Sequence, residues 1–320
     1  MNKFDHRCPC TPSPCLPFSL SPCLRPNHNE TALAKPGMAV ILCIALTAAG
    51  CGTKPDVAKP QGPPGAGGDV AMPAVAPAKT DKPQGNGQLR IAAASDLKFA
   101  LEDIVKAFHR LHANAQVTVT HGSSGSFFAQ LSNKAPFDLF LSADVEYARR
   151  LVEQGHGSPG SAFPYARGHI VLWTLKDSPH DVAHAGFGPL GDKEVKSIAV
   201  ANPKTAPYGR AAIEALKSLG VYEAVEGKLV YGDSVAHAAQ LVESGAADVG
   251  IIALSLAVSP TLRERGKFWQ IPAQAYQPII QGGAIMSWAE DAAIATEFRD
   301  FLLSGQGMSI LKVYGFDTPE

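Results

Sequence analysis

The chain has 320 residues, of which 46% are hydrophobic and 18% are charged, and its formal net charge is −1. This composition excludes a disordered chain and a polytopic membrane protein, and the length allows about two domains. No basic block or interleaved aromatic patch is present, so nucleic-acid binding is not expected.

The N-terminal region carries the features of a leader and an anchor. All six cysteines lie within the first 51 residues, so no disulfide framework is expected after them. Residues 38–50 form an apolar run that is too short to span a bilayer and is typical of a secretory signal, with a buried apolar helix as the alternative. The ending Thr47-Ala-Ala-Gly-Cys51 resembles a bacterial lipobox, which implies lipidation of Cys51. We therefore predict a leader or lipoprotein signal peptide over 1–50 and a flexible tether rich in Pro, Gly and Ala over 51–88.

Strands and helices then alternate in a first α/β unit. Apolar runs predict strands over 89–95, 116–120 and 137–142. Helices are predicted over 97–111, after the serine loop 122–126, and from Asp144 to about 154. Ser95 or Asp96 is expected to cap the first helix. This order is typical of a doubly wound sheet with parallel strands.

A second α/β unit follows a Gly/Pro-rich stretch, 155–168, which is predicted to be a loop. Strands are predicted over 169–175, 197–201, 228–231 and 247–254, and helices over 210–219 and 235–244. Further strands over 268–272 and 277–287, with helices over 289–303 and 307–313, indicate that the chain returns to complete the first unit.

We therefore predict an α/β protein of two lobes, each a mixed, mostly parallel sheet flanked by helices, with a ligand cleft between them. The first lobe is expected over 89–166 and 279–320, and the second over 167–278.

Four loops lie where a predicted strand ends and a helix begins, namely 94–96, 122–126, 206–209 and 233–235. Ligands bind at such strand ends in open α/β sheets, and helix N-termini attract anions. Backbone N–H groups and serine hydroxyls could hold a dianion there without a salt bridge. Plain capping of each helix is the alternative for any one loop.

The chain resembles the periplasmic molybdate-binding proteins of ABC-type importers over nearly all of 89–320. The resemblance is carried by these segments, in order: Ala92-Ala-Ala-Ser95, Gly122-Ser-Ser124, Ala135-Pro-Phe-Asp-Leu-Phe-Leu-Ser-Ala-Asp144, Asn202-Pro-Lys-Thr-Ala-Pro-Tyr-Gly-Arg210, Ala246-Ala-Asp-Val-Gly-Ile-Ile-Ala-Leu254 and Tyr314-Gly-Phe316. The resemblance implies a type II periplasmic-binding fold that grips molybdate or tungstate by neutral hydrogen bonds. It further implies an extracytoplasmic, non-enzymatic monomer without a cofactor that is attached to the membrane only by its lipid and serves an inner-membrane permease.

Carried over position by position, the resemblance places the ligand contacts at Ser95, the N–H of Asp96, Ser124, the N–H of Tyr208 and the N–H of Val235. Some family members add a tyrosine hydroxyl from a later strand, where this chain has Ala253. The carboxylate of Asp96 is expected to turn away from a bound dianion, as a helix cap. Arg210 is expected to be a solvated surface charge.

Three other interpretations remain open from the sequence. The receptor could bind another oxyanion, such as sulfate or phosphate, or a small organic anion. A hydrolase could use the Ser124 loop, although Gly122-Ser-Ser-Gly-Ser126 breaks the Gly-x-Ser-x-Gly pattern and no spacing pairs His121, His169 or His237 with an acid. His109 and His112 could share a metal on one helix face, but no third ligand is evident.

Overall fold

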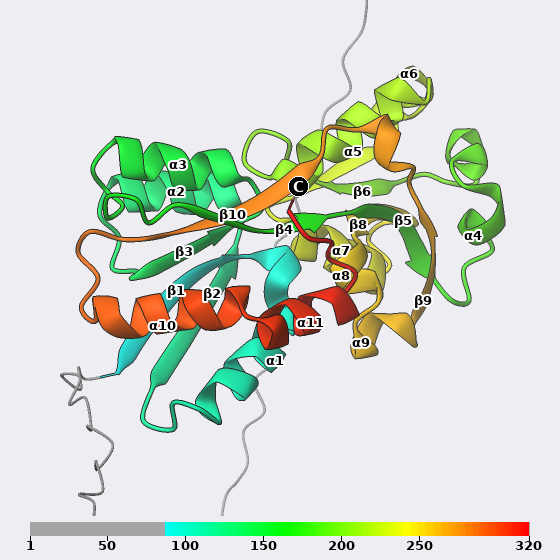
Figure 1. The fold of residues 1–320 in the computed structure, drawn as a ribbon. Helices are drawn as coiled ribbons and strands as arrows, with labels where there is room; N and C mark the ends of the chain where they lie inside the picture. Colours follow the sequence, from blue (N-terminus) through cyan, green and yellow to red (C-terminus); the bar gives the residue numbers. More distant parts are fainter. Residues whose placement is uncertain (1–86, 320) are drawn as a thin grey trace, which may run out of the picture. The chain divides into compact units, whose positions relative to one another are not determined.

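Two mixed sheets of five strands organise residues 87–319, which are the part of the chain that the computed structural model describes (Figure 1). The predicted signal peptide, Cys51 and almost all of the tether lie outside the described residues. Within 87–319, no helix is long and apolar enough to cross a membrane.

The first sheet brings together strands from both ends of the described region. Its order is β2 (Gln116–Gly122), β1 (Gln88–Ala94), β3 (Leu139–Ser142), β10 (Ile279–Ile285) and β4 (Phe163–Gly168). β1 pairs in parallel with β2 and β3, whereas β10 is antiparallel to β3 and β4. Four strands therefore share one direction and only β10 is reversed, which confirms the prediction of a mixed, mostly parallel sheet.

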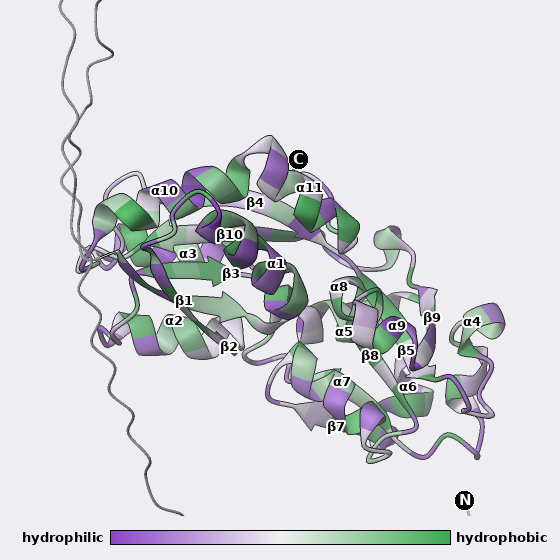
Figure 2. Ribbon diagram, turned by 90° about the horizontal axis from the view of Figure 1, so that it is seen from below, coloured by the Kyte–Doolittle hydropathy of each residue, from purple (hydrophilic) through white to green (hydrophobic). Residues whose placement is uncertain are grey.

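Helices cover both faces of this sheet because the side chains of β1 alternate between two cores. Leu89, Ile91 and Ala93 pack into one cluster, and Ala92 packs into another. The first face carries α1 (Lys98–His109), α10 (Ala292–Leu303) and α11 (Gly305–Val313), and the other carries α2 (Ser124–Ser132) and α3 (Val145–Glu153) (Figure 1). Figure 2 shows hydrophilic and hydrophobic residues on the same helix in α1, α10 and α11, as expected for helices with one buried face.

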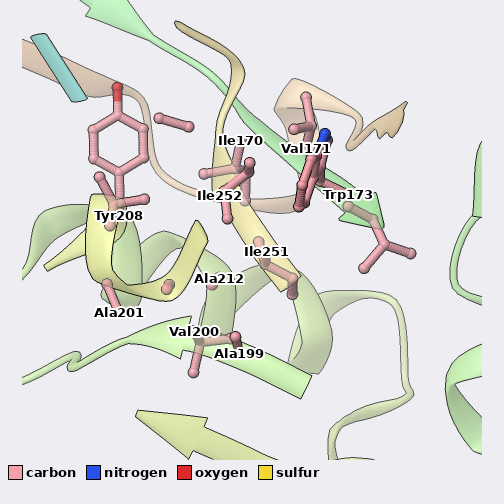
Figure 3. Close-up of a cluster of buried hydrophobic side chains, with 14 of the residues drawn as sticks. Ile170, Val171, Trp173, Ala199, Val200, Ala201, Tyr208, Ala212, Ile251 and Ile252 are labelled. Carbon is pink, nitrogen blue, oxygen red and sulfur yellow. The ribbon is translucent and has the colours of Figure 1, made fainter. Parts of the chain in front are cut away.

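The second sheet has the order β7 (Leu229–Gly232), β6 (Ile198–Ala201), β8 (Val249–Ala253), β5 (Ile170–Leu175) and β9 (Gly266–Gln270). Here β5 is the reversed strand, and β6 pairs in parallel with β7 and β8. α5 (Pro207–Ser218) and α7 (Val235–Glu243) lie on opposite sides of this sheet in Figure 1. Figure 3 shows the core between the sheet and α5, formed by β5, β6 and β8 side chains such as Ile170, Val200 and Ile251.

Short helical turns fill the connections. The α-helical ones are α4 (Val182–Ala185), α6 (Tyr222–Val225), α8 (Leu254–Ala257) and α9 (Pro260–Arg263). The 3₁₀ turns are η1 (Ser95–Leu97), η2 (Gly188–Gly191), η3 (Glu226–Lys228) and η4 (Ala273–Ala275). These single turns carry too little periodicity to be recognised in a sequence.

The chain crosses between the sheets twice. It passes from β4 to β5 through His169 alone, and it returns through residues 271–278 between β9 and β10. We call each sheet with the helices packed on it a lobe, the first lobe being the one that contains β1.

Two of the predicted boundaries were wrong in ways that affect the site. Residues 163–168 were assigned to a loop, but they form β4, an edge strand, where a proline such as Pro164 is tolerated. The helix predicted to begin at Arg210 begins at Pro207, because proline suits the first turn of a helix. Tyr208 therefore lies on the helix itself.

The first helix also begins differently from the prediction. Residues 95–97 form the 3₁₀ turn η1 and α1 starts at Lys98, with no side chain capping either element. Neither Ser95 nor Asp96 is therefore a helix cap. By contrast, Asp144, where the third helix was predicted to begin, caps α3, since its side chain accepts a hydrogen bond from the N–H of Glu146.

Candidate functional site

A small cavity lies where the four predicted loops meet. All five residues that the sequence predicted as ligand contacts line it, three from the first lobe and two from the second. Their exposed fractions are 4% for Ser95, 1% for Asp96, 1% for Ser124, 3% for Tyr208 and 3% for Val235. The two lobes are therefore closed over the cavity in this structure.

Each loop reaches the cavity from the end of a strand. β1 leads into η1, β2 into α2, β6 into α5 and β7 into α7. The helices consequently direct their N-termini at one small volume. The first N–H groups of a helix have no partner within the helix, and the helix dipole makes this end positive. A negatively charged ligand is the natural occupant of such a place.

The two cavity serines are oriented by backbone groups. Ser124 Oγ accepts a hydrogen bond of 2.9 Å from the N–H of Ala143 in the first lobe. Ser95 Oγ accepts one of 3.2 Å from the N–H of Ala236, which belongs to the second lobe. Because a hydroxyl has one donor and two acceptor sites, each serine can still donate its proton to a ligand.

In each second-lobe helix that begins at the cavity, one backbone N–H group of the first turn remains for a ligand. In α7, the N–H of Ala236 goes to Ser95 and that of His237 goes to the capping Ser234, so the remaining first-turn N–H belongs to Val235. In α5, Pro207 has no N–H, and the N–H groups of Gly209 and Arg210 bond the carbonyl of Ala206. The remaining first-turn N–H in α5 is that of Tyr208.

The side chain of Asp96 does not turn outward to cap a helix, contrary to the prediction. Its Oδ2 accepts hydrogen bonds from Tyr208 Oη at 3.0 Å and from Gln281 Nε2 at 2.5 Å. Figure 3 shows the Tyr208 ring projecting from α5 with its hydroxyl directed away from Ala201 and Val200. Burial raises the pKa of the Asp96 carboxyl to about 6, although the hydrogen bonds from Gln281 and from Tyr208 oppose the rise.

Sequence reasoning missed Gln281 and Tyr165, which complete this polar cluster. Gln281 lies on β10 and is fully buried, and its Oε1 accepts a hydrogen bond of 2.8 Å from Tyr165 Oη on β4. A signal for Gln281 existed, because a single amide within an apolar strand must find hydrogen-bond partners when it is buried. No comparable signal exists for Tyr165, whose strand was assigned to a loop.

Contacts between the lobes surround the cavity. The carbonyl of Thr205 in the second lobe accepts hydrogen bonds from Ser123 Oγ at 2.7 Å and from the N–H of Gly125 at 2.8 Å. Ser255 Oγ on α8 donates to the carbonyl of Asp96 at 2.8 Å. These contacts can exist only while the lobes are closed.

Two other residues singled out in the sequence lie outside the cavity lining. Arg210 is not the free surface charge that was expected, since it forms an ion pair with Asp144 and a hydrogen bond with Tyr147 across the lobes. Ala253 is fully buried at the end of β8 and does not line the cavity. The tyrosine among the residues that line the cavity is Tyr208 of α5.

The histidines do not assemble a catalytic base beside Ser124. Two of them do have acidic partners that the spacing had not indicated: His169 bonds Asp317 at 2.8 Å, and His237 lies 3.8 Å from Asp233. None of these four residues lines the cavity, and neither does His121.

The histidine pair on α1 does not form a metal site within the described residues. His112 Nδ1 lies 3.1 Å from a carboxylate oxygen of Glu297, and its ring stacks on Phe108. In residues 87–319, no group of three or more His, Cys, Asp or Glu side chains could hold a metal ion.

Comparison with known proteins agrees with this geometry. Residues 89–317 match the model of a family described as bacterial extracellular solute-binding proteins. The chain is 35% identical over 236 residues to the molybdate-binding protein ModA of Rhodobacter capsulatus, which covers 74% of this chain and 90% of that protein. It is also 29% identical over 228 residues to a candidate ABC transporter substrate-binding lipoprotein of Bacillus subtilis, with coverage of 71% and 85%.

Among solved structures, the periplasmic molybdate-binding protein of Azotobacter vinelandii superposes with a TM-score of 0.67 at 32% identity, covering 72% of this chain and all of that one. The sequence match, the two mixed sheets and the cavity between the lobes agree, and the chain belongs to the family of bacterial extracellular solute-binding proteins.

Proposed function

We propose that this protein is the extracytoplasmic substrate-binding component of an ABC importer that captures molybdate, and also tungstate, and delivers it to an inner-membrane permease. The observation that carries the proposal is the convergence of Ser95, Ser124 and two helix N-termini on one closed cavity. The similarity to proteins named for molybdate binding, at up to 35% identity, supports the choice of anion.

The proposed ligand set consists of neutral donors. The hydroxyls of Ser95 and Ser124 and the N–H groups of Asp96, Tyr208 and Val235 would surround a tetrahedral dianion. Selection would then depend on cavity size and on the number of donors, and sulfate and phosphate are smaller than molybdate. A protonated phosphate would also require an acceptor, which serine hydroxyls and N–H groups directed at a dianion do not supply.

The same proposal includes the boundaries of the lobes and the roles of the N-terminal segments. The lobes would comprise 89–166 with 279–320, and 167–278, except that β4 extends the first of these segments to Gly168. Lipidation of Cys51 would hold the protein at the membrane, with 51–88 as the tether, and the resemblance of the segment 47–51 to a lipobox supports this. The binding protein would act as a monomer and carry out no covalent chemistry.

Titration of the purified protein with four anions tests the proposed function. Molybdate and tungstate are expected to bind with heat in isothermal titration calorimetry, and sulfate and phosphate are expected to bind at least tenfold more weakly because they leave donors unsatisfied. Equal affinity for sulfate or phosphate would refute the selectivity. Absence of binding by all four would refute the function.

The change Ser124→Ala is expected to weaken molybdate binding by about 10- to 100-fold, because a hydrogen bond to a charged group contributes roughly 1.5–3 kcal/mol. Ser126→Ala is the matched control, since Ser126 lies two residues away on the same helix and is exposed. Calorimetry measures both, and melting without ligand reports any effect on the fold. Wild-type affinity in Ser124→Ala would remove this serine from the site, and loss of a hydrolytic turnover in this variant would support the hydrolase alternative.

A further inference from the structure

We propose that Asp96 couples closure of the lobes on the anion to the uptake of one proton, through the cluster that it forms with Tyr208 and Gln281. The inference rests on the proposed function, in that the ligand is taken to be a dianion. Asp96 is a positioning residue in this role, because its side chain acts on the closed state and does not need to touch the ligand.

The cluster spans the two lobes. Asp96 and Gln281 belong to the first lobe and Tyr208 to the second, and Gln281 Nε2 also lies 2.9 Å from Tyr208 Oη. The hydroxyl of Tyr208 lies against the end of β4 in the first lobe, where a Cβ on Gly168 would come within 2.1 Å of it. Opening of the lobes would therefore separate Tyr208 from Asp96 and admit water to the carboxylate.

The closed cluster satisfies only one oxygen of the carboxylate. Both hydrogen bonds from Tyr208 and Gln281 converge on Oδ2, whereas Oδ1 is buried and has no hydrogen-bond partner in the described part of the chain. An ionised carboxylate with an unsatisfied buried oxygen is costly, and protonation at Oδ1 removes the charge while leaving the two bonds to Oδ2 in place.

In the described part of the chain, no cationic side chain forms an ion pair with this carboxylate. The tyrosines Tyr165 and Tyr208 are neutral, because burial and the charge of Asp96 raise the pKa of both well above the usual value. The other titratable groups near η1 are Lys98 on α1, His121 on β2 and His237 on α7. None of the three forms a hydrogen bond or ion pair with Asp96 in residues 87–319.

The direction in which pH changes the affinity follows from the pKa of Asp96 in the closed and in the open state. In the closed state the pKa of Asp96 is about 6, and in an open, hydrated state it returns toward the ordinary value of roughly 3.9. A dianion in the same cavity raises the closed-state pKa further, because like charges disfavour ionisation. The closed, liganded state thus holds more protons, so binding tightens as the pH falls through the closed-state pKa and levels off below the open-state pKa.

Calorimetric titration of the purified protein with molybdate between pH 5.5 and 8.5 tests this coupling. The heat is measured at each pH in two buffers of different ionisation enthalpy, which gives the number of protons taken up. Wild type is expected to take up about half a proton at the closed-state pKa and to approach one proton as the pH falls below it, with affinity rising by up to about tenfold per pH unit on acidification. Asp96→Asn, a neutral analogue of the protonated acid, is expected to show no uptake, a flat pH profile and tighter binding than wild type at pH 8.

Two further variants keep the test decisive. Glu146→Gln alters an exposed carboxylate and should keep the wild-type profile. Tyr208→Phe retains the N–H but removes one donor to Oδ2, so it should shift the profile to higher pH, and it serves if Asp96→Asn does not fold. Binding without proton uptake, or uptake that persists in Asp96→Asn, would overturn the coupling and leave the proposed function intact. Absence of binding by wild type at every pH would refute the function itself.

Discussion

Alanine in place of Gly125 is expected to weaken anion binding by roughly 10- to 100-fold without destabilising the fold. A Cβ at this position would lie 2.6 Å from the carbonyl oxygen of Thr205 and 3.0 Å from its Cα. Both are backbone atoms of the other lobe, so this clash arises on closure, and overpacking of this kind costs about 1–3 kcal/mol. The third neighbour, Tyr147 Oη at 3.1 Å, belongs to the first lobe, but it is the end of a side chain that can give way. Within α2 itself, alanine is favoured over glycine by roughly 0.5–1 kcal/mol.

The comparison that isolates this effect is Gly305→Ala at the start of α11, where a new Cβ meets no atom within 4 Å. Calorimetry with molybdate and thermal melting without ligand are measured for both variants. Gly125→Ala should lose affinity and keep or raise its melting temperature, whereas Gly305→Ala should bind normally. Wild-type affinity in Gly125→Ala would mean that the approach of Thr205 to α2 is not part of the liganded state.

Removal of the Asp138 side chain is expected to cost about 3 kcal/mol of unfolding free energy, because backbone N–H groups lose a buried acceptor and the partly exposed Arg90 keeps only Glu290, at 3.5 Å, as an ion-pair partner. Asp138 is fully buried and accepts hydrogen bonds from the N–H of Arg90 at 2.8 Å, from the Arg90 guanidinium at 2.9 Å through both oxygens, and from the N–H of Glu290 at 3.1 Å. It thereby joins β1 to the segment that follows β10.

This stabilisation has a defined pH dependence. Burial opposes ionisation of Asp138, but the hydrogen bonds from Arg90 and Glu290 and the charge of Arg90 outweigh it, so the net effect is a lowered pKa. The contribution is therefore complete above the unfolded-state pKa of roughly 3.9 and is lost as the pH falls through the lower folded-state value.

Denaturant unfolding of wild type and Asp138→Ala at pH 7 and at pH 3 measures the difference, which should shrink at the lower pH. Glu146→Ala provides the contrast, since the Glu146–Arg149 pair is exposed and should contribute no more than about 1 kcal/mol. A cost for Asp138→Ala as small as that for Glu146→Ala would show that the Arg90–Asp138 pair does not hold the first sheet together.

The fold was predictable because two patterns repeat along this chain: the regular spacing of apolar residues, and the turn-forming residues between successive elements. The run Leu89–Ala94 reads as a buried strand, and the apolar residues after it recur at helical spacing, which indicates alternating layers. The site loops were predictable for the same reason, since each lies between a strand and a helix. The loop predicted over 155–168 contains β4. Pro164 and Gly168 made this segment look like a loop, but an edge strand tolerates such residues.

The contacts between the lobes could not be predicted from the sequence. The approach of Asp96 to Gln281 joins residues 185 positions apart, and no periodicity specifies it. Spacing places the N–H of Tyr208 at a helix start, but it does not reveal that the phenol reaches the first lobe. The direction of the Asp96 carboxylate depends on these distant partners, which is why the expected cap was wrong.

The position of β10 in the first sheet affects the order in which the lobes can be completed. β10 is inserted between β3 and β4, although it follows the whole of the second lobe in the chain. Until residues 279–285 are available, β3 and β4 each present an unpaired edge, and such edges favour association with other chains. The second lobe, by contrast, is continuous from β5 to β9 and can form as soon as its own residues emerge. A nascent or translocating chain is therefore expected to complete its second lobe first, with the first lobe vulnerable to aggregation until residues 279–285 have arrived.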